Sequence, residues 1–187
     1  MTSMAGSRDD DRARRFRDAA LPHLDDVYTL ARYLLRNVAD ADDAVQECYL
    51  RAFRHFDGFR GQAIKPWLMA ILRNVCHAEF ARRSGPLLVG AEAAAAEDAS
   101  PLWQEEAHTA EAEMLRQQDA EMIHGLLDAL PEPFREAIVL RDINDLSYQD
   151  IAEVMGAPIG TVMSRLARAR TMLRNAWLKR KMMEQHV

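Results

Sequence analysis

Apolar residues in the first half of the chain recur with the spacing of helix faces. Over 24–36, and again in the segment that begins at Pro66, they fall three and four positions apart, as on the buried side of an amphipathic helix. Between these segments runs a longer stripe made of Val45, Cys48, Tyr49, Ala52, Phe53 and Phe56. We expect this middle helix to be capped by Asp40 and to end before Gly58. Pro66 suits the first position of the helix that follows.

The last third of the chain contains two short helical patterns separated by a turn. The first has an apolar stripe at Tyr148, Ile151, Ala152 and Met155. Gly156 is placed to end that helix, and Pro158 begins a turn. Thr161 then stands where it could cap a second helix, whose inward residues are Val162, Leu166, Ala169 and Leu173. Two short helices joined by a glycine-containing turn predict a helix-turn-helix unit.

The patterns together predict an all-α protein built from two small helical domains. No segment alternates apolar and polar residues for the length of a strand. We expect the domains at 12–83 and 119–187, the second of which contains the helix-turn-helix. The stretch 84–118 is rich in Ala and Glu and is broken by Ser-Gly-Pro and Ser-Pro, which indicates a flexible linker. Residues 1–11 are expected to be disordered.

Charge is unevenly distributed along the chain. The formal net charge of the 187 residues is −5, which by itself argues against a nucleic-acid-binding protein. The excess acid lies in one place, however, because 84–126 contains nine acidic residues and one basic residue. By contrast, 159–181 contains seven basic residues and no acidic one, and 50–83 contains seven basic and two acidic residues. We therefore expect an acidic linker between two domains with basic segments.

Composition and cysteine spacing limit the cellular location and the cofactors that we expect for the protein. The longest apolar run, 67–72, is far shorter than the ~20 residues of a membrane span, and the N-terminus lacks the apolar segment of a secretory signal. Cys48 and Cys76 lie far apart and form neither a disulfide framework nor a zinc motif. We expect a cytoplasmic protein that is not inserted in a membrane and that has no cofactor and no metal.

The second helix of the helix-turn-helix has a polar face that suits DNA. At about 100° per residue, one outward face carries Thr161, Ser164, Arg165 and Arg168, and its flank carries Arg170 and Arg174. Arginine can hydrogen-bond to guanine with both arms of its guanidinium, and Ser and Thr bind bases or phosphates. The alternative is an ordinary helical hairpin with a solvated basic face. The acid-free run and the turn residues together favour DNA binding.

These segments occur in the order found in one protein family. The helix-turn-helix and the preceding 126–155 resemble the DNA-binding domain of the extracytoplasmic-function (ECF) group of bacterial RNA polymerase sigma factors, and GTVMSRLARARTMLR resembles its recognition helix. The segment DADDAVQECYLRAFRHF, at 40–56, resembles the polymerase-binding helix of the family. The segment KPWLMAILRNVCHAEFARR, at 65–83, resembles its promoter-melting helix. The resemblance covers both predicted domains.

The resemblance implies a sigma factor that binds core RNA polymerase and directs initiation at specific promoters. The polar face at 161–174 would read the −35 element of promoter DNA as duplex. The N-terminal domain would melt and hold the −10 element, for which the matching positions are Arg60, Gln62, Lys65, Trp67, Arg73, Asn74 and His77. The polymerase would be bound by the exposed face of the helix at 40–54, made of Asp42, Asp43, Gln46, Glu47 and Leu50. An anti-sigma factor is implied as a further partner.

Some of these positions have a second interpretation. Basic residues interleaved with Phe59, Trp67 and Phe80 suit single-stranded DNA, because bases stack on aromatic rings. Trp67, however, stands at the start of a helix and is equally consistent with a packed core residue. The acid near the start of the helix at 40–54 is also favourable to the helix dipole alone.

Two further segments have open interpretations. In the family the linker threads the polymerase cleft, so Leu102 and Trp103 are a candidate docking point on the polymerase or on an inhibitor. The alternative is a solvated tether. The tail after Leu173 either extends the last helix or contacts a partner.

Two other classes of protein were weighed. A conventional helix-turn-helix regulator with a helical sensing or dimerising domain explains 127–181 but leaves the match at 40–83 as coincidence. An enzyme would have to use Cys48, Cys76, His55 or His77, and the sequence contains no glycine-rich phosphate loop, metal-ligand motif or paired catalytic carboxylates. We therefore expect no catalysis and no small-molecule substrate.

Overall fold

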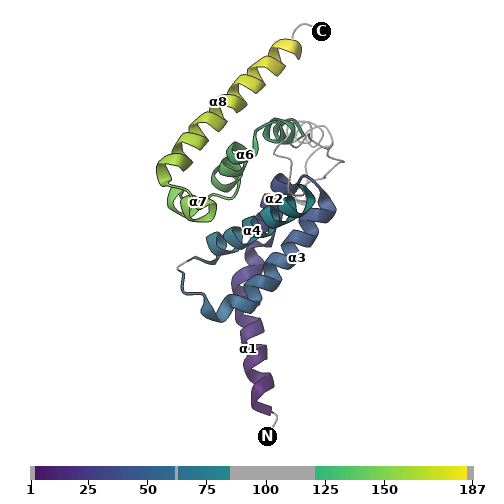
Figure 1. Cartoon of the computed structure of the whole chain (residues 1–187), viewed down its shortest axis with the longest axis vertical. Coiled ribbons are helices and arrows are strands. Elements are labelled where there is room, and N and C mark those ends of the chain that lie inside the picture. The colour runs from purple at the N-terminus through teal and green to yellow at the C-terminus, as the bar shows by residue number, and fades with distance from the viewer. Residues whose placement is uncertain (1–2, 62, 85–120, 185–187) are drawn as a thin grey trace, which may run out of the picture.

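The computed structural model describes residues 3–61, 63–84 and 121–184 (Figure 1). Its elements are α1 (Ser3–Ala20), η1 (Leu21–His23), α2 (Leu24–Leu35), α3 (Val38–His55), η2 (Phe56–Gly58), α4 (Ile64–Ser84), α6 (Glu132–Ile138), η3 (Val139–Ile143), α7 (Tyr148–Met155) and α8 (Ile159–Glu184). Residues 121–128 are also helical. Within these described ranges there is no strand, and the expected all-α fold class is confirmed.

The N-terminal domain is a bundle in which α2, α3 and α4 pack around one core. The predicted apolar stripes supply that core, with Leu30 and Leu34 from α2, Cys48 and Ala52 from α3, and Leu68 and Leu72 from α4 all buried. Phe16 of α1 closes one end, with its ring edge-on to three aromatic rings of 49–56. Arg12 holds α1 in place, because it donates to the carbonyl of Phe53 at 2.6 Å and pairs with Asp57 at 3.0 Å.

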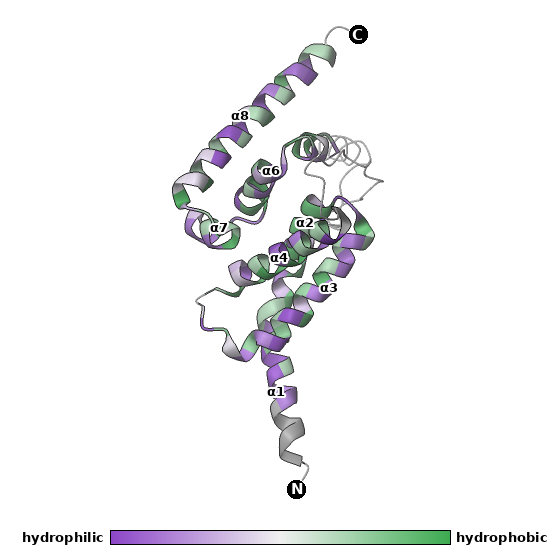
Figure 2. Cartoon of the chain, in the orientation of Figure 1, coloured by the Kyte–Doolittle hydropathy of each residue, from purple (hydrophilic) through white to green (hydrophobic). Residues whose placement is uncertain are grey.

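The helix α1 was not predicted from the sequence. It begins at Ser3, inside the segment 1–11 for which we expected disorder, and it continues to Ala20. Figure 2 shows that the coloured part of α1 is largely hydrophilic toward its N-terminal side, so it offers no apolar stripe by which a helix could be recognised. The second half of α1 packs against the domain through Phe16, and the polar first half continues the same helix.

Three helix starts differ from those expected. The N-cap of α3 is Asn37, whose side chain accepts a hydrogen bond from the backbone N–H of Asp40 at 3.0 Å, so the prediction of Asp40 as N-cap was wrong. Pro66 lies at the third position of α4, which is tolerated because N–H groups of the first turn have no partner within the helix. Thr161 lies inside the first turn of α8 and does not cap it.

The helix-turn-helix is confirmed, and local interactions fix its turn. Ser147 and Asp150 form a capping box at the start of α7, each side chain accepting from the backbone N–H of the other residue. Gly156 ends α7 in the left-handed conformation, with φ of 58°, as the sequence indicated. The buried side of α8 consists of Val162, Leu166 and Ala169.

The two domains are in contact with each other. Helix α4 packs on α7, and α2 packs on α6 and η3, as Figure 1 shows. Their buried apolar side chains form one continuous cluster. Polar groups also join them, because Asn144 donates to the carbonyl of Asp26 at 2.8 Å and the hydroxyl of Tyr33 lies 2.7 Å from Nδ1 of His124 in a hydrogen bond. The predicted linker 84–118, with Leu102 and Trp103, lies outside the described residues except for Ser84 at the end of α4.

Candidate nucleic-acid interface

The helix-turn-helix core directs one face of α8 outward. Ser164 and Arg168 are exposed on that face, and Thr161 and Arg165 are half-buried. The hydroxyl of Ser164 donates to the carbonyl of Thr161 at 2.9 Å, which leaves its oxygen able to accept a further hydrogen bond. The structure thus places all four side chains on the first half of one helix, with Ser164 and Arg168 directed away from its buried side. This is the face that the spacing predicted.

The two flanking arginines of α8 differ in their surroundings. Arg170 makes two hydrogen bonds to the carboxylate of Asp142, at 2.8 and 3.4 Å, and this hydrogen bonding raises the pKa of its guanidinium. Asp142 belongs to η3, so the pair ties α8 to the element before the helix-turn-helix. Arg174 is exposed. Arg170 is therefore held by the carboxylate of Asp142, a contact that was not predicted.

The loop before α4 carries the first of the residues matched to the −10 element. Arg60 is exposed and donates to the carbonyls of Asp57 and Phe59, at 2.6 and 3.1 Å. Lys65 forms an ion pair with Asp26 of α2 at 2.8 Å. Gln62 lies outside the described residues. Of these two basic side chains, Arg60 is the more open to solvent.

Trp67 is half-buried and is paired with a second aromatic ring. Its ring centroid lies 4.7 Å from that of Phe59, with 34° between the planes, and its side chain also packs against the core cluster. Gly61 permits this arrangement, because a Cβ at that position would come within 2.6 Å of the Phe59 ring. The pair thus combines core packing with a partly accessible aromatic surface beside the loop.

The remaining residues matched to the −10 element lie on α4, and two of them contact the other domain. Arg73 Nε lies 2.5 Å from a carboxylate oxygen of Glu136, and His77 Nε2 lies 3.7 Å from one of Glu132. The Glu136 side chain is only 3% exposed, and that of Arg73 is 20% exposed. Asn74 is exposed. These carboxylates were not predicted to lie there, although Glu132 and Glu136 have the same spacing of four as Arg73 and His77.

The face of α3 matched to the polymerase is largely open. Asp42, Asp43 and Gln46 are exposed, and Leu50 is 52% exposed. Glu47 is half-buried and accepts from Arg51 one turn later, at 2.6 Å. The structure therefore brings an exposed leucine and several acidic or amide side chains together on one helix face, as predicted.

The residues weighed for an enzyme lie in two different environments. Cys48 and Cys76 are completely buried, and burial raises the pKa of each thiol to about 12. His55 and His77 are exposed. In the described ranges no three His, Cys, Asp or Glu side chains are grouped to hold a metal ion. No described helix is long and apolar enough to cross a membrane.

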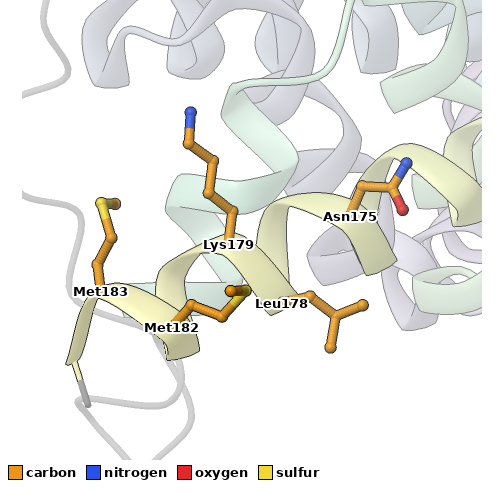
Figure 3. Close-up of a pocket in the computed structure, with 5 residues that line it drawn as sticks. All are labelled: Asn175, Leu178, Lys179, Met182 and Met183. Carbon is orange, nitrogen blue, oxygen red and sulfur yellow. The ribbon is translucent and has the colours of Figure 1, made fainter. Parts of the chain in front are cut away.

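The C-terminal half of α8 extends beyond the helix-turn-helix. Figure 3 shows its exposed side, which is lined by Asn175, Leu178, Lys179, Met182 and Met183. Leu178, Met182 and Met183 are each more than half exposed. Of the two interpretations of the tail, the structure bears out the extension of the helix, which runs to Glu184.

Comparisons with known proteins agree with this architecture. The family profile described as Sigma-70 region 2 matches residues 20–85, and the one described as Sigma-70, region 4 matches residues 120–173. The ECF RNA polymerase sigma-E factor of Haemophilus influenzae is 36% identical over 151 residues, which cover 78% of this chain and 78% of that protein. The ECF RNA polymerase sigma factor EcfG of Rhodopseudomonas palustris is 34% identical, with 84% of this chain and 82% of that protein covered.

Solved structures share the arrangement of helices. The sigma factor RpoE of Bartonella quintana, solved in complex with the anti-sigma factor NepR, has a TM-score of 0.67 and 26% sequence identity, with 87% of this chain and 96% of that chain covered. CnrH, solved in complex with the cytosolic domain of CnrY, shares the fold at a TM-score of 0.61 and 23% identity. The two region matches, the identity over most of the chain and the helix-turn-helix lead to one conclusion: the chain belongs to the ECF group of RNA polymerase sigma factors.

Proposed function

We propose that this sigma factor reads the −35 element as duplex with α8 and holds the −10 element as single strand on α4 and the loop before it. The observation that carries the proposal is the outward face of α8, where Arg168, Arg165 and Ser164 are presented by a rigid helix-turn-helix core. In this assignment 12–83 is the polymerase and −10 domain, 84–118 is a linker, and 119–187 is the −35 domain. The protein selects the promoter and performs no chemistry of its own.

The −35 reading depends on how α8 enters the major groove. A helix-turn-helix places the N-terminal part of its second helix against base edges. Arg168 is the exposed arginine nearest that end, and it has both arms of its guanidinium available for a guanine. Arg170 supports the reading indirectly, because its pair with Asp142 fixes α8 relative to η3. Arg174, farther along the helix, suits a phosphate.

The −10 reading depends on a different set of groups. Asn74 is exposed on α4 and offers both a donor and an acceptor to a base edge. Arg60 is exposed in the loop beside the Phe59–Trp67 pair, and this combination of a cation and an aromatic surface suits an unpaired base and its phosphate. We assign Lys65, Arg73 and His77 to the same surface, although Lys65 and Arg73 form ion pairs with carboxylates and His77 lies 3.7 Å from a carboxylate oxygen of Glu132.

We assign two protein partners to this chain. The exposed face of α3 docks on core RNA polymerase, with Leu50 as the apolar centre and Asp42, Asp43, Gln46 and Glu47 around it. Such a surface fits a basic partner with an apolar spot. An anti-sigma factor is the second partner, and the complex of RpoE with NepR supports this assignment through the similarity of fold.

Binding measurements with matched variants test these assignments separately. The variant Arg168→Ala is expected to weaken binding of −35 duplex by about 1–3 kcal/mol, because a base-reading arginine contributes that much. Lys179→Ala is its control, since it removes the same charge from an exposed position on the same helix. Neither variant should alter binding to core polymerase. Equal weakening by both variants would mean that α8 binds phosphates without reading bases there.

The polymerase face has its own control. Leu50→Ala is expected to lower the affinity for core polymerase and to leave duplex binding unchanged. Leu178→Ala is matched to it, because both leucines are 52% exposed. If core polymerase binds the Leu50 variant as tightly as the Leu178 variant, the assigned face is incorrect. If core polymerase does not bind the parent chain at all, the protein acts as a conventional helix-turn-helix regulator instead.

A further inference from the structure

Two large apolar side chains are exposed at the start of α8, next to the polar face that the helix-turn-helix directs outward. Ile159 is 49% exposed and Met163 is 53% exposed, whereas Val162 and Leu166 of the same turns are buried. Neither Ile159 nor Met163 is among the described side chains that form the core cluster or pack against it. Residues four positions apart in a helix are neighbours on its surface, so the two side chains form one small apolar patch, the Ile159–Met163 patch.

The patch adjoins residues on the face that we assign to DNA. Met163 precedes Ser164 in the chain and lies one turn from Gly160 and Ala167, and all four residues are exposed. A Cβ at Gly160 would meet no atom within 4 Å, so the surface beside Met163 is open. Because Gly160 has no side chain and Ala167 has only a methyl group, Met163 has the longest side chain of these four residues.

Met163 stands at the end of α8 that approaches bases. The helix begins at Ile159, four residues earlier, and side chains in a helix lean toward its N-terminus. In a helix-turn-helix the N-terminal part of the second helix lies against base edges in the major groove. The Ile159–Met163 patch thus belongs to the part of α8 that enters the groove, where contact with DNA would remove its apolar surface from water.

The base edges in the major groove offer one apolar group. Guanine, cytosine and adenine present hydrogen-bond donors and acceptors there, and thymine adds the methyl group on its C5 atom. The thioether of Met163 has no donor and is only a weak acceptor, so it gains little from the polar groups. The methionine side chain is also unbranched and adapts its shape to an apolar neighbour. Among the base edges, the thymine methyl group is therefore the one that Met163 fits.

Met163 and Arg168 are far enough apart to contact different base pairs. They are separated along the helix axis by about 7.5 Å, because each residue of a helix adds about 1.5 Å. Successive base pairs are about 3.4 Å apart, so this separation is roughly two base-pair steps when α8 follows the groove. A guanine bound by Arg168 and a thymine packed on Met163 can therefore occur together in one −35 element.

We propose that Met163 selects a thymine in the −35 element by packing on its 5-methyl group, with Ile159 beside it shielding the contact from water. This inference rests on the proposed function, which places this face of α8 in the major groove. It adds an apolar contact to the hydrogen bonds assigned to Arg168 and Ser164. One position of the −35 element is then recognised by a methyl group rather than by a hydrogen bond.

The test removes the methyl group from the DNA and keeps the hydrogen-bonding groups of the base. The chain, assembled with core RNA polymerase, is titrated with a fluorescent duplex of a promoter that it transcribes. Each thymine of the −35 element, on either strand, is replaced in turn by deoxyuridine. Burial of one methyl-sized group contributes about 0.8 kcal/mol, and about 1.4 kcal/mol is tenfold in affinity, so one of these replacements should weaken binding about fourfold.

Two variants of the protein show whether Met163 makes the methyl contact. Met163→Ala should bind the thymine duplex several-fold more weakly than the parent and should lose the difference between thymine and uracil at that position. Met183→Ala is the matched control, because Met183 is 59% exposed on the same helix, about 30 Å farther along its axis, and this variant should keep the difference. The difference is measured within each variant, so a change in the folded fraction does not affect it.

The outcomes separate this inference from the −35 assignment. If scrambling the −35 element weakens binding but no deoxyuridine does, the inference is overturned and the −35 assignment stands, as it would if the patch served a protein partner. If one deoxyuridine weakens binding of the parent and of Met163→Ala equally, another group reads the methyl, and the inference is again overturned. If scrambling the −35 element leaves binding of the parent unchanged, the −35 assignment itself is refuted.

Discussion

Replacement of Glu136 by alanine tests whether the contact between the domains exists in solution. The Glu136 side chain is 3% exposed, and its carboxylate lies 2.5 Å from Nε of Arg73. Removing the carboxylate leaves the guanidinium of Arg73 without its acidic partner. The variant also removes one attachment of α6 to α4, so the two domains should unfold less cooperatively.

The expected magnitude follows from the burial of both side chains. Removing one partner of a fully buried pair costs about 3–5 kcal/mol, since a charge is left without compensation. Arg73 is 20% exposed, so its guanidinium can regain some water. We therefore expect Glu136→Ala to lower the free energy of unfolding by about 2 kcal/mol, below the fully buried range.

Urea denaturation followed by circular dichroism measures this change. Glu153→Ala is the control, because Glu153 is exposed and such substitutions usually stay within about 0.5 kcal/mol. A double-mutant cycle with Arg73→Ala isolates the pair and should give a coupling energy of about 1–2 kcal/mol. If Glu136→Ala is no more destabilising than Glu153→Ala, the ion pair is not formed in the free protein.

Three further predictions concern the turn, the core and pH. Gly156→Ala should destabilise the protein by about 1 kcal/mol, because φ is 58° at this position. Gly160→Ala, at an open position in α8, should not destabilise it, and equal melting temperatures for the two variants would contradict the prediction. Leu166→Ala should lower the free energy of unfolding by about 2–5 kcal/mol, because this side chain on the buried side of α8 is only 2% exposed. A decrease of less than about 1 kcal/mol in chemical denaturation would contradict the packing. Above pH 9 the free energy of unfolding should fall, because burial raises the pKa of the Cys48 and Cys76 thiols to about 12 in the folded protein, whereas in the unfolded chain they ionise near 9.0. A variant with both cysteines replaced by alanine should show a shallower fall over the same pH range, and an unchanged slope would refute the assignment to thiols.

The helix-turn-helix could be predicted from the sequence because the signals that form it are local. The apolar stripe of α7, the glycine at its end and the inward positions of α8 all lie within a few turns of one another. Gly156 adopts the left-handed conformation that its place after the stripe indicated. The stripes of α2, α3 and α4 were equally visible. Each of these elements buries one face, and periodicity reports such a face directly.

Features that depend on distant residues were not visible in the same way. The spacing predicts Arg170 on the DNA-binding flank, but no local pattern indicates that Asp142, 28 positions earlier, binds it. The pairing of Arg73 with Glu136 likewise depends on how two domains dock, which periodicity does not encode. The first helix was missed because its polar half has no apolar face and is supported by the packing of Phe16. The N-cap of α3 is Asn37, three residues before the predicted Asp40, because its side chain accepts from the backbone N–H of Asp40.

Run-off transcription with purified core RNA polymerase and a pool of genomic promoter fragments tests the central claim most directly. Adding this chain to core polymerase should produce discrete transcripts whose start sites lie at a fixed distance downstream of two shared sequence elements. The Arg168→Ala variant should lose these transcripts in proportion to its loss of duplex binding, and Lys179→Ala should retain them. A transcript pattern identical to that of core polymerase alone would contradict the account.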